Sequence, residues 1–118
     1  MSFQVKTGEE DEETLYRQRS KLFKFRDSQW KERGVGEIKM MRHKHSGRIR
    51  IVMRRQQVHK VCCNHYLTPD LVLEPMSTSE RAFCWKAIDF SDPKGRLDQF
   101  AARFKVSILN TMFHLIDE

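Results

Sequence analysis

The side chains best suited to metal chemistry in this 118-residue chain lie in its middle third. Zinc accepts imidazole and thiolate ligands. The residues of these types are His43, His45, His59, Cys62, Cys63 and His65. His43 and His45 would share one face of an extended strand, but the paired C-x2-C and H-x3-H spacings of zinc sites are absent. We therefore expect no metal site, with a cysteine packed as a small apolar residue and the histidines partly exposed.

Motifs for nucleophilic or phosphate chemistry are also missing. The sequence contains no G-x-S-x-G nucleophile turn, no Gly-rich phosphate loop of the Walker type and no H-E-x-x-H helix. We therefore expect no catalytic residue, no enzyme activity and no cofactor of its own.

The distribution of charge along the chain says more about function than these motifs do, because it is uneven. The formal net charge is +6, but residues 1–16 hold one Lys and five acids, residues 17–69 hold 15 Lys and Arg against three acids, and residues 70–118 hold six against eight. The acidic first segment would be repelled by nucleic acid and by an anionic membrane. This polarity favours a protein partner that carries one basic patch and one acidic segment, and we expect neither nucleic acid nor membrane binding.

The basic middle and the acidic run 9–13 each leave an alternative open. Alternation places Arg48, Arg50 and Arg54 on the strand face opposite Ile49, Ile51 and Met53, with Lys39, Arg42, Arg55 and Lys60 nearby in sequence. These cations would repel one another unless an anion neutralises them; the alternative is a solvated sheet face. The acidic run could likewise be a solubilising tail, or a self-inhibitory one that folds back on the basic face.

Hydrophobic patterning predicts about seven short strands followed by one helix. Residues 1–14 show no apolar periodicity and are expected to form an acidic arm, extended or disordered when free, ahead of a single domain at 15–118. Alternating or apolar strand segments occupy residues 21–26, 38–42, 48–54, 58–63, 71–73, 81–90 and 97–104, while the polar residues 30–34, which end in Gly, indicate a turn or the start of a strand. Apolar residues spaced three and four apart after Ser107 predict the helix. The fold class is mainly β, a curved sheet or partly open barrel whose end the helix covers.

The cysteines, the N-terminal segment and Trp30 give three further expectations. The three cysteines cannot form a disulfide framework, so a reducing compartment is expected. No secretory signal is found, and no apolar run approaches the roughly 20 residues of a membrane span. Trp30 suits a core position and an interface equally well.

The strings LFKF, WKERGVGEIKMMRHKHSGRIRIVMRRQQVHKVCCNHYLTPDLVL, RAFCWKAIDF and QFAARFK resemble a Ran-binding domain over residues 5 to 105. Such domains occur in the large cytoplasmic-filament nucleoporin and in the small cytoplasmic Ran-binding protein. The resemblance implies a pleckstrin-homology-like fold, in which seven strands form a bent barrel capped by a C-terminal helix. It also implies binding without catalysis. The segment 106–118 departs from the family, being more apolar than its usual charged helix.

The resemblance further implies a monomeric partner of the small GTPase Ran in its GTP form, with GTP and magnesium belonging to Ran. Ran's acidic C-terminal segment would bind the basic face, and the acidic arm would contact a basic patch on Ran. Binding would assist the Ran GTPase-activating protein and weaken the hold of nuclear transport receptors, in the cytoplasm or at the cytoplasmic face of the nuclear pore complex. The alternative is a phosphoinositide- or peptide-binding module of the same fold. The implied contact residues are Glu9, Glu10, Asp11, Glu12, Glu13, Trp30, Lys31, Arg33, Arg54, Arg55, Gln57, Lys60 and Asn64.

Overall fold

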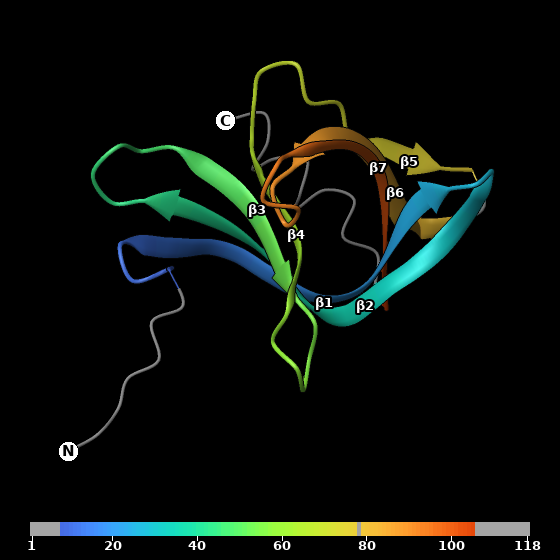
Figure 1. The fold of residues 1–118 in the computed structure, drawn as a ribbon, viewed down its shortest axis with the longest axis horizontal. Coiled ribbons are helices and arrows are strands. Elements are labelled where there is room, and N and C mark those ends of the chain that lie inside the picture. The colour runs from blue at the N-terminus through green and yellow to red at the C-terminus, as the bar shows by residue number, and fades with distance from the viewer. Residues whose placement is uncertain (1–7, 78, 106–118) are drawn as a thin grey trace.

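The computed structural model describes residues 8–77 and 79–105, which form one antiparallel sheet (Figure 1). The strand order across the sheet is β4-β3-β2-β1-β7-β6-β5. In this part of the chain the strands are β1 (Glu12–Arg26), β2 (Gln29–His43), β3 (Ile49–Arg54), β4 (Val61–Tyr66), β5 (Glu74–Met76), β6 (Ser79–Asp89) and β7 (Arg96–Phe104). Within these ranges no helix is long and apolar enough to cross a membrane.

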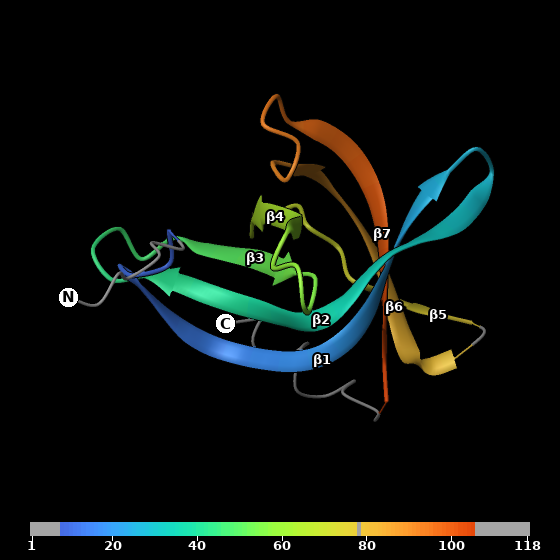
Figure 2. The same ribbon diagram turned by 60° about the horizontal axis from the view of Figure 1, so that its bottom comes forward.

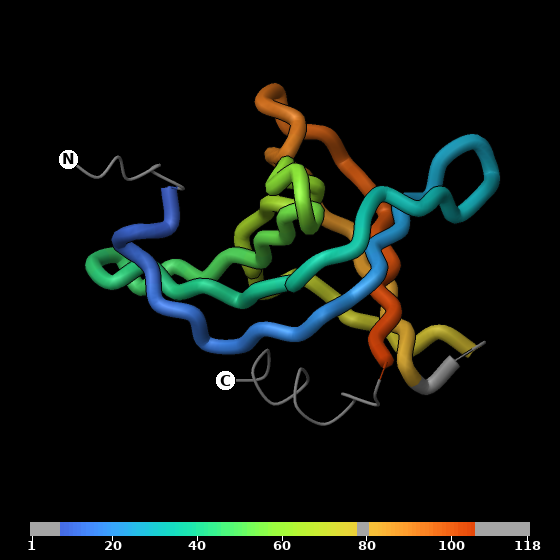
Figure 3. The backbone as a smooth tube through the Cα atoms, turned by 90° about the horizontal axis from the view of Figure 1, so that it is seen from below, coloured from blue at the N-terminus to red at the C-terminus, as the bar shows by residue number. Residues whose placement is uncertain are grey.

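The long hairpin of β1 and β2 sets the curvature of the sheet. Asp27 and Ser28 both have positive φ, 52° and 62°, which is the backbone of a two-residue type I′ turn. The register shifts between Thr14 and Tyr16 and again between Leu22 and Phe23. Such bulges bend a strand, and Figure 2 shows β1 and β2 curving along their length. In Figures 2 and 3 the tip of this hairpin projects away from β3 and β4.

Alternating residues of the strands fill a core on the inner side of the bent sheet. Phe83, Phe100 and Leu22 are completely buried. Trp85 stacks on Phe100 with ring centroids 5.4 Å apart, and its indole Nε1 donates to His65 Nε2 at 2.9 Å. Burial lowers the pKa of His65, which keeps the imidazole neutral and able to accept this hydrogen bond.

The two halves of the sheet meet where β4 approaches the end of β6. Phe90 N donates to the carbonyl oxygen of Asn64 at 2.7 Å, and Asn64 N donates to Asp89 Oδ1 at 2.9 Å. Asp89 is completely buried and also pairs with Lys24 of β1, Nζ to Oδ2 being 2.6 Å. Lys24 Nζ lies 3.4 Å from Asp98 of β7 as well. A buried polar network thus holds the bent sheet together at this end.

The expected mainly β fold is confirmed, with differences at three segments. β1 begins at Glu12, ahead of the expected Leu15, because residues 12–14 pair with β2. Residues 56–58 form a turn and residues 59–60 are irregular chain, so no strand starts at residue 58; Gln57 and His59 have φ of 73° and 56°. Residues 71–73 pack as irregular chain, and the short strand lies at 74–76. The helix expected after Ser107 lies outside the described residues, and the division at residue 14 stays a prediction.

We predict that Asp89→Asn lowers the free energy of unfolding by about 3 kcal/mol at pH 7, because Lys24 loses its closest buried counter-charge. Burial raises the pKa of Asp89, but hydrogen bonds from Lys24, Ser91 and the Asn64 amide outweigh that effect and leave the pKa lowered. The carboxylate therefore stabilises the fold above the unfolded-state pKa of about 4, and this contribution is lost as pH falls toward the lower folded-state value.

Urea denaturation at pH 7 and between pH 5 and 3 measures both effects. Asp11→Asn is the matched control, because Asp11 is exposed. An Asp89→Asn variant as stable as the control at pH 7, or with the wild-type loss of stability in acid, would contradict the assignment.

Candidate functional site

The outer face of β2 and β3, opposite the core, carries the cations of the basic middle. Lys39, Arg50 and Arg54 project from this side, while Ile38 and Ile51 point into the core. We refer to Lys39, Arg50 and Arg54 as the outer-face cations, whereas Arg42 pairs with Ile49 and projects from the other side of β2. The expected alternation of this segment is confirmed.

The acidic run folds back onto these outer-face cations. Glu12 accepts two hydrogen bonds from Arg50, at 2.9 Å from Nε and 2.6 Å from a terminal nitrogen. Glu9 lies 3.3 Å from Arg54 Nε and 3.7 Å from Lys39 Nζ. The Glu12 and Glu9 side chains are only 8% and 11% exposed, so these pairs are better shielded from solvent than ordinary surface ion pairs.

Backbone contacts explain why the run reaches this position. Glu12 N donates to the carbonyl oxygen of Glu9 at 3.1 Å, and Lys44 N donates to that of Asp11 at 2.8 Å. Strand pairing then sets Glu13 opposite Arg42, with which it forms a charge-assisted hydrogen bond of 2.7 Å from Nε. The hydrogen bonds that Arg50 donates to Glu12 raise the pKa of its guanidinium. Three acids of the run are therefore matched to cations of the same chain.

Two glycines seat the loop between β3 and β4. Gln56 N donates to the carbonyl oxygen of Val35 at 2.8 Å, which lays the loop across β2. A Cβ at Gly36 would run into the carbonyl oxygen of Arg54, and one at Gly34 would lie 2.6 Å from Arg55 Cγ. The GVG of the WKERGVG string thus allows the close approach that places Arg55.

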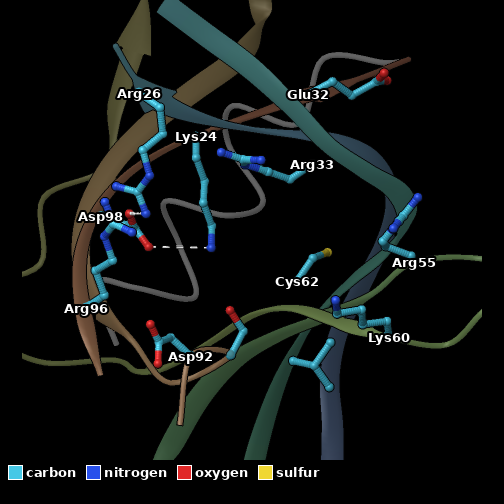
Figure 4. Close-up of a pocket in the computed structure, with 12 residues that line it drawn as sticks. Lys24, Arg26, Glu32, Arg33, Arg55, Lys60, Cys62, Asp92, Arg96 and Asp98 are labelled. Carbon is cyan, nitrogen blue, oxygen red and sulfur yellow. Dashed lines mark ion pairs between the residues drawn. The ribbon is translucent and has the colours of Figure 1, made fainter. Parts of the chain in front are cut away.

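A hollow of about 480 Å³ opens between this loop, the β1–β2 hairpin and the β6–β7 connection (Figure 4). We call it the loop hollow. Cys62 lies in its wall; burial raises the pKa of this thiol to about 11, although Lys24 and Arg55 oppose the shift. The cations that line the hollow are Lys24, Arg26, Arg33, Arg55, Lys60 and Arg96.

These six cations differ in whether the protein already neutralises them. Lys24 and Arg26 form ion pairs with Asp98 at the base of the hollow. By contrast, no ion pair or side-chain hydrogen bond within residues 8–77 and 79–105 engages the following side chains: Arg33, Arg55, Lys60 and Arg96. The loop hollow therefore holds positive charge that the described part of the chain leaves without a counter-ion.

The structure distributes the predicted contact residues over three places. Glu9, Glu12, Arg54 and Asn64 meet at the outer face, where Asn64 Oδ1 accepts from Arg50 at 3.0 Å, and Glu13 pairs with Arg42 on the other side of the sheet. Arg33, Arg55, Lys60 and the neighbouring Gln57 belong to the loop hollow or its loop. Glu10 and Asp11 lie exposed in the turn before β1.

Trp30 and Lys31 lie apart from both surfaces, near the tip of the β1–β2 hairpin. Trp30 is half-buried outside the main core, with its ring edge-on to Phe25 at 5.2 Å between centroids. Lys31 Nζ pairs with Asp27 at 2.9 Å. Sequence reasoning missed Arg26 and Arg96 of the loop hollow, because strand pairing and loop packing bring them to Lys60 from distant parts of the chain.

The histidines and cysteines considered as metal ligands are dispersed. His43 and His45 lie at the β2–β3 turn, where His43 Nδ1 accepts the backbone amides of His45 and Ser46. His65 and Cys63 are buried in the core. Across 8–77 and 79–105, no three His, Cys, Asp or Glu side chains form a group that could hold a metal ion.

Comparison with known proteins places this arrangement in a family. Residues 4–116 match the sequence model of the RanBP1 domain. The chain belongs to this family. Human E3 SUMO-protein ligase RanBP2 is 52% identical over 104 residues, 86% of this chain and 3% of that protein. Human RanBP2-like and GRIP domain-containing protein 3 is 48% identical over 109 residues, 91% of this chain and 6% of that protein. The chain thus spans a small fraction of these relatives' length.

Solved structures of the same kind match the fold. The Ran-binding domain of Nup2 from Ashbya gossypii has a TM-score of 0.70 and 28% identity over 83% of this chain and 84% of that chain. A second structure of that domain, described as part of the nuclear pore complex component NUP2, has a TM-score of 0.65 and 27% identity over 80% and 84%. The resemblance read from the sequence is confirmed.

We predict that Gly36→Ala destabilises this RanBP1 domain by about 2 kcal/mol, because the added methyl group would overlap backbone of the β3–β4 loop. Gly34→Ala is the matched comparison, since its methyl group would meet only the Arg55 side chain, and we expect a smaller loss. Urea denaturation measures both, and amide NMR shifts of residues 54–60 report loop displacement. Equal losses for the two variants, or no shift in the loop with Gly36→Ala, would contradict this seating.

Proposed function

We propose that this chain binds the small GTPase Ran in its GTP form, as a binding module without catalysis. The match to the RanBP1 domain over residues 4–116 carries the proposal. Two further observations support it: the structural neighbours are Ran-binding domains of Nup2, and the chain presents acidic and basic surfaces that suit a partner of opposite polarity.

The acidic C-terminal segment of Ran would bind at the outer-face cations, while residues 9–13 would turn to a basic patch on Ran. Glu9 and Glu12 already occupy Arg54, Lys39 and Arg50. Binding is therefore an exchange, in which one acidic segment replaces another on the same cations. The net free energy is the difference between two sets of similar ion pairs, so the internal acids weaken the capture of any acidic competitor that lacks further contacts.

The remaining contact residues would extend the interface on either side. Arg33, Arg55 and Lys60 have no counter-ion in the described part of the chain and can attract an acidic surface without first losing an ion pair. Gln57 lies exposed on the same loop. Trp30 and Lys31 lie on the projecting hairpin, where a half-buried aromatic side chain can anchor a partner.

Selectivity for GTP would be indirect. The chain need not touch the nucleotide if Ran's C-terminal segment is available for capture only in the GTP conformation, since differential affinity then selects that state. Holding this segment away would favour the GTPase-activating protein and weaken transport receptors' hold on Ran, which assists disassembly of export complexes. GTP and magnesium stay on Ran. A site in the cytoplasm or at the cytoplasmic face of the nuclear pore fits the pore origin of NUP2.

We predict that the full chain binds Ran loaded with a non-hydrolysable GTP analogue about 100-fold more tightly than Ran with GDP. The reason is that only one nucleotide state makes the acidic segment available. Isothermal titration calorimetry with the two nucleotide forms measures the difference. Equal affinities would refute the proposal for the GTP form, and no binding to either form would refute Ran binding itself.

We predict that Glu9→Gln strengthens binding of a synthetic peptide with Ran's acidic C-terminal sequence about threefold, because Arg54 and Lys39 lose an internal competitor. Fluorescence anisotropy at low ionic strength measures the change. Glu74→Gln, an exposed position on β5, is the control for the equal change in net charge. If Glu9→Gln leaves the affinity unchanged or matches the control, the acidic run does not compete for the outer face.

A further inference from the structure

We infer that the loop hollow is a binding site for a compact anion bearing several phosphate groups, a site separate from the outer face. Four cations converge there without a counter-ion among the described residues, and they come from three separate segments. Arg33 belongs to β2, Arg55 and Lys60 to the ends of the β3–β4 loop, and Arg96 to the start of β7.

The acids around the hollow do not balance this charge, because three acids line it against six cations. Asp98 pairs with Lys24 and Arg26. Glu32 lies 3.5 Å from Lys21 Nζ, and Asp92 Oδ1 accepts the backbone amide of Lys94 at 3.0 Å. Uncommitted cations facing one hollow repel one another, and a bound polyanion removes that repulsion.

The surrounding structure fixes the base of the hollow before any ligand arrives, while the four uncommitted cations around it are exposed to solvent. Asp89 and Asp98 fix Lys24 at the base, and the missing side chain at Gly34 allows Arg55 to pack against β2. Figure 4 shows Arg33 and Lys60 directed toward the space enclosed by the labelled residues, with Arg96 at its far wall. Binding therefore orders the exposed side chains around a base that is already fixed, and part of the electrostatic attraction is spent on that ordering.

The chemistry and size of the site favour phosphate over a carboxylate chain. Arginine offers a planar fork that binds phosphate oxygens bidentately, and lysine adds a compact charge. A volume of about 480 Å³ lies in the range of small-ligand sites. An extended acidic segment would suit the length of the strands better than this compact hollow. A multiply phosphorylated small ring, either soluble or as a lipid headgroup, has the charge density that the hollow requires.

Calorimetric titration of the full chain with inositol hexakisphosphate tests the site. We expect saturable one-to-one binding that weakens as salt is raised, and a loss of about tenfold in affinity for Arg96→Gln and for Lys60→Gln. Arg17→Gln removes the same charge from a side chain that is 68% exposed and lies outside the hollow, and we expect it to bind as the wild type does. An absence of binding, or an equal loss with Arg17→Gln, would overturn the site.

Two further experiments distinguish a lipid headgroup from a soluble phosphate, and a phosphate ligand from an acidic peptide. Vesicles of phosphatidylcholine with 5% phosphatidylinositol bisphosphate, compared with phosphatidylcholine alone in a sedimentation assay, support the headgroup source if the chain sediments only with the former. Binding of the soluble phosphate alone supports the soluble source. A hexaglutamate peptide that binds as tightly as inositol hexakisphosphate and is equally weakened by Arg96→Gln would overturn the preference for phosphate.

This inference goes beyond Ran binding and can fail separately from it. Arg96 is not among the proposed Ran contacts, so Arg96→Gln should lose the phosphate ligand and keep its affinity for Ran. If wild-type protein binds Ran but not inositol hexakisphosphate, only the phosphate site is wrong. If Arg96→Gln weakens both equally, the hollow belongs to the Ran surface and the separate site is refuted.

Discussion

The buried pairing of Lys24 with Asp89 is the interaction on which the rest of the structure depends. A carboxylate that is completely removed from solvent costs several kcal/mol unless a cation and hydrogen-bond donors compensate it. Asp89 obtains both, from Lys24 and from the amides of Asn64 and Ser91, and in doing so it joins β1, β4 and β6. One continuous series of polar contacts passes through this pair and links the outer face to the loop hollow: Glu12, Arg50, Asn64, Asp89, Lys24, Asp98 and Arg26.

Ion pairing within the chain shows that the net charge does not describe one uniform basic surface. The excess of +6 suggests one basic surface awaiting an acidic partner, but the structure divides the cations into two populations. Those of the outer face are hydrogen-bonded to acids of the same chain, as Arg50 is to Glu12. Those of the loop hollow, such as Arg33 and Arg96, have no such partner in the described residues. An acidic partner therefore has to displace the chain's own acids at the outer face, whereas it can bind the cations of the loop hollow without displacing any ion pair.

Sequence patterns predicted the strands well where local alternation decides the structure, as at Ile49, Ile51 and Met53. They failed where distant contacts decide it. Nothing local marks residues 56–58 as a turn, because the loop is held by contacts distant in sequence, such as the hydrogen bond from Gln56 N to the carbonyl oxygen of Val35. The fold-back of the acidic run was one of two open alternatives, since the pairing of Glu12 with Arg50 spans 38 positions. Arg96 was missed for the same reason, as the sheet topology brings it to the wall of a hollow that Lys60 also lines.

The two cationic surfaces should also differ in how salt acts on them. Ion pairs such as Glu12 with Arg50 are partly buried and geometrically bidentate, so counter-ions screen them weakly. The cations around the loop hollow are open to solvent and are screened by the ionic atmosphere at physiological salt. Salt therefore weakens long-range attraction to the hollow more than it releases the acidic run from the outer face. An acidic partner that uses both surfaces has to gain its affinity from close, desolvated contacts, because exchange of one ion pair for another contributes little by itself.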